Sequence, residues 1–307
     1  MNNLDPQALE CLAAIVEEGG FERAAQRLNI TQSAVSQRLR ALEAQAGTVL
    51  VVRSRPLRAT AAGQLFIKHT KMLRLLRADL EREWRDIAPG HEGSGGEEEG
   101  VSVAINADSI ATWALPALDS LARSGAPVEI FADDQAFTQD WLRQGKVMGC
   151  VTSMNQALRG CRMVALGSMD YIAVATPDYA HAHVPKGLSA HNFHRLQFVA
   201  HNRKDFIPRE FIAKALGLSA PTLRRVFTPS STAQVRVTQA GWGVGVLPRL
   251  MVQDLVDAGE LVHLLPSYSH WVDLSWHCWN LDSDVLANLT VALTDAASLS
   301  LRAPGRG

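Results

Sequence analysis

Residues 21–47 constrain the fold more than any other stretch, because they predict two short helices joined by a tight turn. Phe21–Leu28 forms the first helix, and Asn29-Ile30 turns the chain. Thr31 follows with a hydroxyl that can cap the second helix by accepting a hydrogen bond from a free backbone N–H. That second helix has an apolar stripe at i, i+4 and i+7, typical of a face packed on a core: Val35, Leu39 and Leu42.

The opposite side of the second helix is polar and free of acidic residues. Hydroxyls, amides and guanidiniums of this kind suit the floor of the DNA major groove, where they meet base edges and phosphates. The side chains on this polar face are Ser33, Ser36, Gln37 and Arg40. An ordinary amphipathic helix pair would show the same spacing, so this pattern alone leaves both interpretations open.

Charge is segregated toward the N-terminal part of the chain. Residues 21–77 contain eleven Lys or Arg and two acids, whereas the whole chain has a formal net charge of −1. Within this basic region Val49–Val52 predicts a short strand, Arg53, Arg55 and Arg58 lie in or beside a turn, and Thr60 begins the next helix. A helix-turn-helix followed by a basic hairpin predicts a winged DNA-binding domain whose wing contacts phosphates or the minor groove.

Length and composition predict a protein of two or more compact units. The 307 residues exceed what one hydrophobic core usually supports, and 47% are hydrophobic. No apolar run reaches the ~18 residues of a membrane-spanning helix, and the first ten residues lack the features of a signal peptide. We therefore expect a cytoplasmic protein without a membrane partner. The four cysteines are scattered, and neither a catalytic constellation nor a metal or cofactor motif is visible, so we expect no enzyme, metal or cofactor.

Residues 61–87 form one long helical pattern with an apolar seam and charged flanks. A helix of this length with no small core beside it favours pairing with its copy in a second subunit. The seam residues assigned to this dimer contact are Leu65, Met72, Leu76 and Leu80. The alternative is that the seam packs on the chain's own C-terminal half. Residues 89–100 are rich in Gly and Glu and predict a flexible hinge.

From residue 101 the pattern becomes α/β, with strands and helices alternating. The expected strands are Val101–Ile105, Val128–Ala132, Val147–Thr152, Met169–Thr176, Val244–Leu247 and Asp273–Trp279, and the expected helices are Ser109–Ala122, Gln135–Gln144, 208–216 and 232–241. A second α/β unit inserted into the first, with the chain leaving near residue 168 and returning near 268, explains this order.

Open α/β sheets bind ligands beyond the carboxyl ends of their strands. The first three expected strands end in polar residues, which are Asn106, Asp108, Ser109, Asp133, Asp134, Thr152 and Ser153. Together they offer three acids, several hydroxyls and the N-terminus of a helix, which favours a carboxylate. They predict a small-molecule site, although helix capping and solvation of strand ends would also account for the acids.

The first 90 residues closely resemble the LysR-type transcriptional regulators. The resemblance lies in Glu22-Arg23-Ala24-Ala25, Leu28, Thr31-Gln32-Ser33-Ala34-Val35-Ser36, Leu42-Glu43, Gly47, Leu50, Arg53, Thr60 and Gly63. It implies that Gln32, Ser33, Ser36, Gln37 and the wing residue Arg53 or Arg55 face DNA. Thr31 and Arg40 complete our candidate DNA-binding set.

The C-terminal half resembles the branch of this family that senses arginine and lysine and controls amino-acid export genes, also described as a chromosome replication initiation inhibitor. The matching residues are 105–118 and Asp170-Tyr171. The branch implies a periplasmic-binding-protein-like effector domain and a ligand contact near Ser230-Ser231, so Ser231 is a candidate. Thr232 stands where the branch has an acid, which leaves the choice of ligand open.

We therefore expect an α/β protein with four parts, namely a winged helix-turn-helix domain (1–60), a linker helix (61–88), a hinge (89–100) and an effector domain (101–305). The effector domain divides into subdomain I (101–168 and 268–305) and subdomain II (169–267).

The expected effector is lysine or arginine, bound between the two subdomains. Ser109, Thr112 and backbone N–H groups would hold its carboxylate, and Asp108 with Asp133 or Asp134 would hold its cations. The expected partners are promoter DNA with an AT-rich pseudo-palindrome, a second copy in a homodimer or tetramer, and RNA polymerase. The alternatives are a replication-origin or architectural DNA-binding protein, and a small-molecule-binding protein with a vestigial DNA domain.

Overall fold

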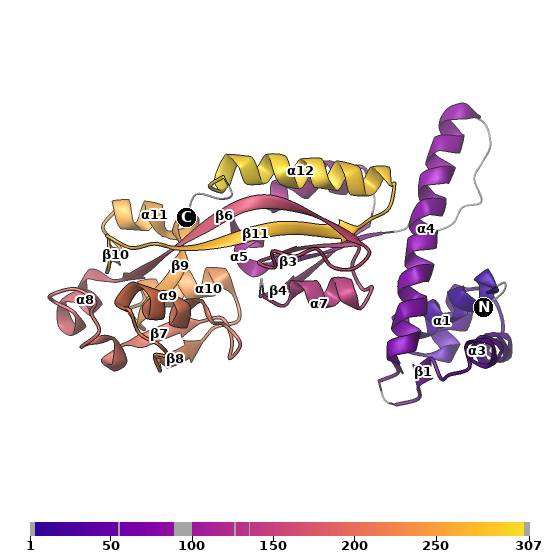
Figure 1. Ribbon diagram of the computed structural model, residues 1–307, viewed down its shortest axis with the longest axis horizontal. Helices are drawn as coiled ribbons and strands as arrows, with labels where there is room; N and C mark the ends of the chain where they lie inside the picture. The colour runs from indigo at the N-terminus through magenta and orange to yellow at the C-terminus, as the bar shows by residue number, and fades with distance from the viewer. Residues whose placement is uncertain (1–3, 55, 89–99, 126, 135, 304–307) are drawn as a thin grey trace.

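The computed structural model describes residues 4–54, 56–88, 100–125, 127–134 and 136–303 (Figure 1). Its N-terminal part is a helical domain with a small hairpin. The elements are α1 (Pro6–Glu17), α2 (Phe21–Arg27), α3 (Gln32–Ala46), β1 (Val51–Val52), β2 (Arg58–Ala59) and the long helix α4 (Ala61–Ile87). The three short helices enclose one hydrophobic core, to which α4 adds Phe66 and Ile67.

The predicted helix-turn-helix is confirmed as a structural unit in α2 and α3. Asn29 has a positive φ of 52° in the turn between the two helices, a conformation that Asn tolerates better than most residues. Thr31 caps α3, because its Oγ1 accepts a hydrogen bond of 3.2 Å from the backbone N–H of Ala34. Val35, Leu39 and Leu42 are all buried, as their spacing predicts.

The hairpin that follows α3 is shorter than expected. Only Val51 and Val52 of the predicted strand Val49–Val52 pair with β2, and the two strands are antiparallel. The Glu43 carboxylate accepts a hydrogen bond of 2.8 Å from the backbone N–H of Leu50, which ties α3 to the start of this hairpin. Thr60 then caps α4 by accepting from the Gly63 N–H.

The effector half is α/β, as expected, with more strands and helices than the sequence predicted. Its strands are β3 (Val101–Asn106), β4 (Val128–Asp133), β5 (Gly149–Thr152), β6 (Cys161–Ala175), β7 (Gln197–Ala200), β8 (Arg224–Phe227), β9 (Val244–Pro248), β10 (Val262–His263) and β11 (His270–Trp279). Its helices are α5 (Ala107–Thr112), η1 (Leu115–Leu118), α6 (Asp119–Arg123), α7 (Thr138–Arg143), α8 (Pro177–His183), η2 (Phe193–Arg195), α9 (Ile207–Leu216), α10 (Ser231–Gln239), α11 (Arg249–Asp257) and α12 (Asp284–Ser300). None of the described helices is long and apolar enough to cross a membrane.

One expected helix is wrong in its extent. The predicted helix Ser109–Ala122 is divided into α5, η1 and α6. Pro116 lies at the start of η1, and a proline has no backbone N–H to continue the hydrogen-bond ladder of the preceding helix. The short α5 therefore ends at Thr112, which limits the side chains that it can present to a ligand.

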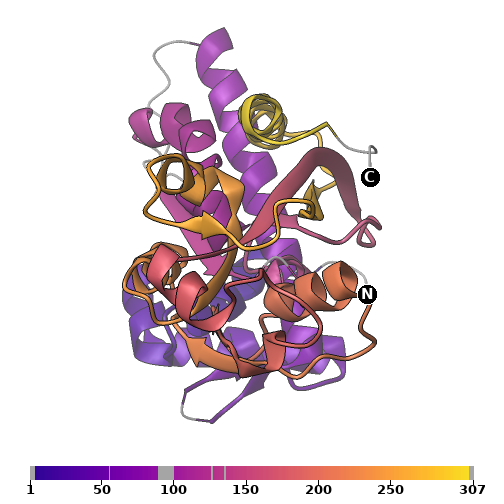
Figure 2. The same ribbon diagram turned by 90° about the vertical axis from the view of Figure 1, so that its left-hand side faces the viewer.

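All nine strands of the effector half form one sheet, in the order β4-β3-β5-β11-β6-β9-β7-β8, with β10 also paired to β6. β6 and β11 are the long strands at its centre, and they pair antiparallel from Tyr171 and His270 to Cys161 and Trp279 (Figures 1 and 2). The chain thus enters and leaves subdomain II within two paired strands. α12 lies along β6 and β11, and α9 and α10 pack on the strands of subdomain II.

Helix α4 contacts both halves of the molecule. Leu75 is buried in the core of the effector half, and the partly buried Met72, which the sequence assigned to a subunit contact, packs on the same core. The other seam residues remain exposed, with Leu65 at 67%, Leu76 at 39% and Leu80 at 62%. One side of α4 therefore packs within the chain, as the alternative interpretation held, while another side stays uncovered.

Candidate effector and DNA-binding sites

The polar face of α3 is open to solvent. Gln32, Ser33, Gln37 and Arg40 are exposed and Ser36 is half-buried. Thr31 is exposed and serves as the cap, and its Oγ1 also lies 2.9 Å from Ser33 Oγ. Arg38 makes a contact within the domain, since its guanidinium donates a hydrogen bond of 2.7 Å to Gln7 Oε1. The candidate DNA-binding residues of the helix thus lie on one accessible surface.

Two of the three predicted wing arginines, Arg53 and Arg58, lie within the described residues. Arg53 is exposed, and its guanidinium lies 5.5 Å from the centre of the Phe21 ring. Arg58 is exposed on β2. Arg55 lies outside the described residues. The contact with Phe21 places Arg53 beside the start of α2, next to the helix-turn-helix.

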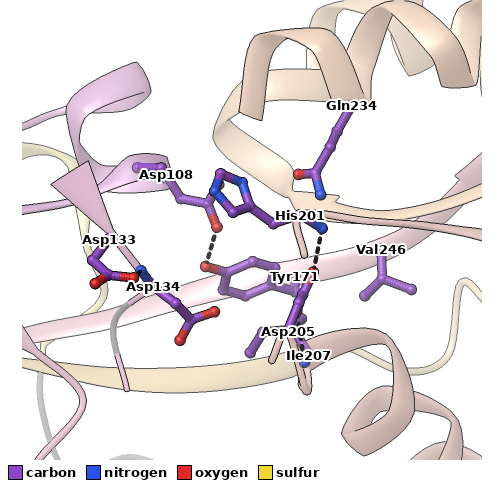
Figure 3. Close-up of a pocket in the computed structure, with 10 residues that line it drawn as sticks. Asp108, Asp133, Asp134, Tyr171, His201, Asp205, Ile207, Gln234 and Val246 are labelled. Carbon is purple, nitrogen blue, oxygen red and sulfur yellow. Dashed lines mark hydrogen bonds between the residues drawn. The ribbon is translucent and has the colours of Figure 1, made fainter. Parts of the chain in front are cut away.

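The effector half has a cavity at the junction of its two subdomains (Figure 3). It is a narrow space between the side chains, and the surrounding empty volume of about 360 Å³ includes space that is open to solvent. The lining residues are Ala107, Asp108, Asp133, Asp134, Tyr171, His201, Asp205, Ile207, Gln234 and Val246. We call this the effector cavity. Subdomain I supplies three of its acids at the carboxyl ends of β3 and β4, and subdomain II supplies the fourth, Asp205.

Asp108 is held by two hydroxyl groups from subdomain II and its connecting strand. Tyr171 donates a hydrogen bond of 2.6 Å to Asp108 Oδ2, and Ser231 donates one of 2.6 Å to Asp108 Oδ1. Ser231 opens α10, whose cap is Ser230. The Asp108 carboxylate therefore links the two subdomains across the effector cavity. Ser231 does not line this cavity, so it can influence a ligand only by holding Asp108.

The other three acids are each fixed by N–H donors. The Asp134 N–H donates to Asp133 Oδ1 at 2.9 Å, and the Trp141 indole N–H donates to Asp133 Oδ2 at 3.2 Å. Asp134 Oδ1 accepts from the Ala136 N–H at 2.9 Å. Asp205 accepts from the backbone N–H groups of His201 and Ile207. The loops themselves thus orient the carboxylates toward one space.

Burial and the charges of neighbouring acids raise the pKa values of two of these carboxyl groups. Burial, together with the negative charges of Asp205 and Asp108, raises the pKa of Asp134 to about 6. Burial and the charge of Asp108 also raise the pKa of Asp205. The pKa of Tyr171 is raised well above its ordinary value by burial and by Asp108, so the phenol stays neutral and donates. The effector cavity is therefore short of positive charge.

Several predicted effector residues do not line the effector cavity. Asn106 and Ser109 are fully buried, and their side-chain polar atoms have no hydrogen-bond partner in the described structure. The Thr112 hydroxyl donates to the backbone carbonyl of Asp108, within α5. Thr152 Oγ1 donates to Gln139 Oε1, and Ser153 lines a neighbouring cavity that also includes Asp134.

Four polar residues that line the effector cavity were not among the predicted effector-binding residues, namely Tyr171, His201, Asp205 and Gln234. The sequence pointed to Tyr171 only as part of the family resemblance, without a role in binding. His201 and Asp205 follow β7, whose carboxyl end lies at the effector cavity. The rule that identified Asp108 and Asp133 would have found them if the four-residue strand β7 had been predicted.

This arrangement suits a small ligand with more than one positive charge. Four carboxylates from two subdomains can accept charge-assisted hydrogen bonds, and the Gln234 amide and the His201 ring can donate to an anionic group. Within the described ranges, no group of three or more His, Cys, Asp or Glu has the geometry to hold a metal ion.

We expect the ligand-free protein to lose stability as the pH rises through the titration of Asp134. Its pKa in the folded protein, about 6, exceeds the ordinary aspartate value of 3.8, so the folded state binds more protons than the unfolded state between pH 4 and 6. Stability should therefore fall as the pH rises across that window. Asp134→Asn should flatten this dependence and raise the Tm at pH 7, measured by thermal unfolding. Asp282→Asn, at an exposed loop position, is the control, and an unchanged pH profile for Asp134→Asn would contradict the expectation.

Two family models match the chain and together cover most of its length. One is described as "Bacterial regulatory helix-turn-helix protein, lysR family" and matches residues 6–64. The other is described as "LysR substrate binding domain" and matches residues 94–280. These two matches correspond to the domain with the exposed α3 and to the α/β half with the effector cavity.

Relatives and solved structures agree with these models. The HTH-type transcriptional regulators ArgP of Pseudomonas aeruginosa and Proteus mirabilis are 38% and 37% identical to this chain, covering 93% and 96% of both sequences in each pair. The crystal structure of ArgP from Mycobacterium tuberculosis matches at 34% identity and a TM-score of 0.85, over 98% of this chain and 100% of that one.

The full-length LysG of Corynebacterium glutamicum with bound effector Arg matches at 32% identity and a TM-score of 0.75, over 97% of this chain and 100% of that one. The chain belongs to the LysR family of transcriptional regulators, which are DNA-binding proteins and not enzymes.

Proposed function

We propose that this protein binds arginine or lysine in the effector cavity and, in response, controls the transcription of genes for amino-acid export or metabolism in the cytoplasm. The observation that carries the proposal is the meeting of four carboxylates from two subdomains, one of them with a pKa raised to about 6. A basic amino acid has two cationic groups that would relieve this repulsion. The names of the ArgP relatives and the arginine in LysG support the same ligand class.

The positions of the carboxylates suggest how such a ligand binds. Asp108, with Asp133 or Asp134, accepts from the α-amino group and the side-chain cation. Ser109 and Thr112, which the sequence suggested for the ligand carboxylate, do not line the effector cavity. Gln234 and His201 replace them in the proposal, because their side chains do line it and can donate hydrogen bonds. Closure of the two subdomains on the ligand is then favoured.

DNA recognition in this proposal uses two surfaces of the N-terminal domain. Gln32, Ser33, Ser36, Gln37 and Arg40 approach base edges in the major groove, and the wing arginines neutralise phosphates. A dimer formed through α4 presents two copies of α3 to an AT-rich pseudo-palindrome. Pairing of dimers into tetramers and contact with RNA polymerase complete the proposed assembly.

Isothermal titration of the full-length protein tests the effector. We expect L-arginine or L-lysine to bind and L-leucine, which lacks the second cation, to bind far more weakly. Asp108→Asn should weaken binding about tenfold or more, because a charge-assisted hydrogen bond is lost. Asp282→Asn should bind as the wild type does. Leucine binding as tight as that of arginine and lysine, or an unchanged affinity in Asp108→Asn, would remove the effector cavity from this role.

The salt dependence of DNA binding tests the wing. Arg53→Ala should weaken binding to all duplexes and reduce the slope of log K against log salt by about 1, the effect of one lost phosphate contact. The measurement is fluorescence anisotropy with a duplex selected by the wild-type protein from a random library. Arg123→Ala, which removes an exposed charge from α6, should leave the slope unchanged. Equal slopes for Arg53→Ala and the wild type would disprove the phosphate contact.

The oligomeric state tests the uncovered side of α4. Its exposed apolar residues form a stripe that begins at Leu65 and continues eight positions later with residues spaced three or four apart, which are Leu73, Leu76, Leu80, Trp84 and Ile87. Leu76→Lys places a charge in this stripe, and we expect monomers by light scattering. Leu299→Lys, at a leucine of α12 that is 88% exposed, should stay dimeric. A Leu76→Lys protein that remains fully dimeric would exclude α4 as the interface.

A further inference from the structure

Trp141 lies between the effector cavity and the linker helix α4. Its indole N–H donates to Asp133 Oδ2 at 3.2 Å, and its ring packs against Phe131, with ring centres 4.8 Å apart. The indole therefore fixes one carboxylate of the effector cavity from behind.

The turn after α7 is fastened to the same tryptophan. The Lys146 N–H donates to the Trp141 carbonyl at 3.0 Å, and Lys146 Nζ lies 4.5 Å from the centre of the indole ring. The Gly145 N–H donates to the Leu142 carbonyl. Asp133, Trp141 and the Gly145-Lys146 turn are thus joined by successive hydrogen bonds and ring contacts.

The Gly145-Lys146 turn lies in close contact with α4. Lys71 Nζ donates to the Lys146 carbonyl at 3.3 Å. Gly145 is buried with a φ of +68°, and a Cβ at this position would lie 2.5 Å from Lys68 Cβ and 2.9 Å from Lys68 Cα. Any residue larger than glycine would push α4 away. The contact therefore depends on the absence of a side chain at position 145.

The same stretch of α4 binds the DNA-binding domain through α1. Lys71 Nζ also lies 3.8 Å from Glu17 Oε1. One turn further along, Arg74 Nε donates to Glu10 Oε2 at 2.8 Å, and Arg74 Nη1 lies 3.3 Å from Glu17 Oε2. One lysine thus contacts the effector half through a carbonyl and the DNA-binding domain through a carboxylate.

We propose that Trp141 is a positioning residue that couples the effector cavity to the DNA-binding domain, through α7, the Gly145-Lys146 turn and α4. A ligand cation that binds Asp133 draws this carboxylate toward the ligand, and the indole N–H that is hydrogen-bonded to it moves with it, together with the turn fastened to Trp141. The turn then alters its contact with Lys68 and Lys71, and so the position of α4 on α1. This inference rests on the proposed function, since it takes arginine or lysine as the ligand.

Two substitutions interrupt this route at different points. Trp141→Phe removes the N–H donor and keeps an aromatic ring beside Phe131. Gly145→Ala disturbs the contact with Lys68 without touching the effector cavity. Gly217→Ala is a matched control, because Gly217 has the same φ of +68° with nothing within 4 Å of its added Cβ. Trp242→Phe, at an exposed tryptophan, is the control for the aromatic change.

The test measures two affinities of each full-length variant. One is the affinity for L-arginine and L-lysine by titration calorimetry, and the other is the affinity for the library-selected duplex, with and without each amino acid. In the wild type and both controls, we expect the amino acid to change DNA affinity about tenfold, within the usual range of allosteric coupling. In Trp141→Phe and Gly145→Ala this ratio should approach one, while the amino acid still binds within about tenfold of its wild-type affinity.

The outcomes separate this inference from the proposed function. If neither amino acid binds the wild type, the proposed ligand is wrong. In that case the DNA affinity measured without ligand decides. Gly145→Ala, unlike Gly217→Ala, should still change this affinity several-fold by moving α4, and an unchanged affinity would overturn the coupling. If the amino acid binds and both variants keep the wild-type ratio, or if the wild-type ratio is itself one, the coupling through Trp141 is overturned.

Discussion

The pairing of β6 with β11 is the interaction on which the effector half depends. β6 runs from subdomain I into subdomain II, and β11 pairs with it across that boundary, so each subdomain is attached to the same antiparallel ribbon. The parallel strands of subdomain I attach to one side of this ribbon through β5, and those of subdomain II attach to the other through β9. Because the ribbon is continuous, the carboxyl ends of β3, β4 and β7 come to the same junction, where the effector cavity lies.

The acids at this junction oppose stability in the ligand-free state. Burial raises the pKa values of Asp134 and Asp205, and the negative charges of neighbouring acids raise them further, which reflects the cost of keeping these carboxylates charged. Local hydrogen bonds from backbone N–H groups, Tyr171 and Ser231 hold the carboxylates in place nonetheless. A site that is destabilising when empty and relieved by a cation is suited to sensing, since binding then favours one conformation of the protein.

The N-terminal domain was largely predictable from sequence, because its helices have regular apolar spacing and capping residues such as Thr31 and Thr60. In the effector half, the carboxyl-end rule identified Asp108, Asp133 and Asp134, which all line the effector cavity. It failed for Ser109 because neighbouring residues of a helix point about 100° apart, so Asp108 and Ser109 cannot both face one ligand.

Asp205 could not be found from sequence, since β7 has only four residues and too little periodicity to identify it. The contact of Gly145 with Lys68 joins residues 77 positions apart in the chain, and no local pattern predicts such packing.

The two edges of the nine-stranded sheet differ in charge. The edge strand β4 has the acids Glu129 and Asp133, whereas the opposite edge strand β8 has the exposed arginines Arg224 and Arg225. Two like edges brought together in a symmetric pair would repel each other, whereas an acidic β4 edge and a basic β8 edge would attract. Charge therefore opposes symmetric pairing of two such sheets through like edges, whether β4 meets β4 or β8 meets β8.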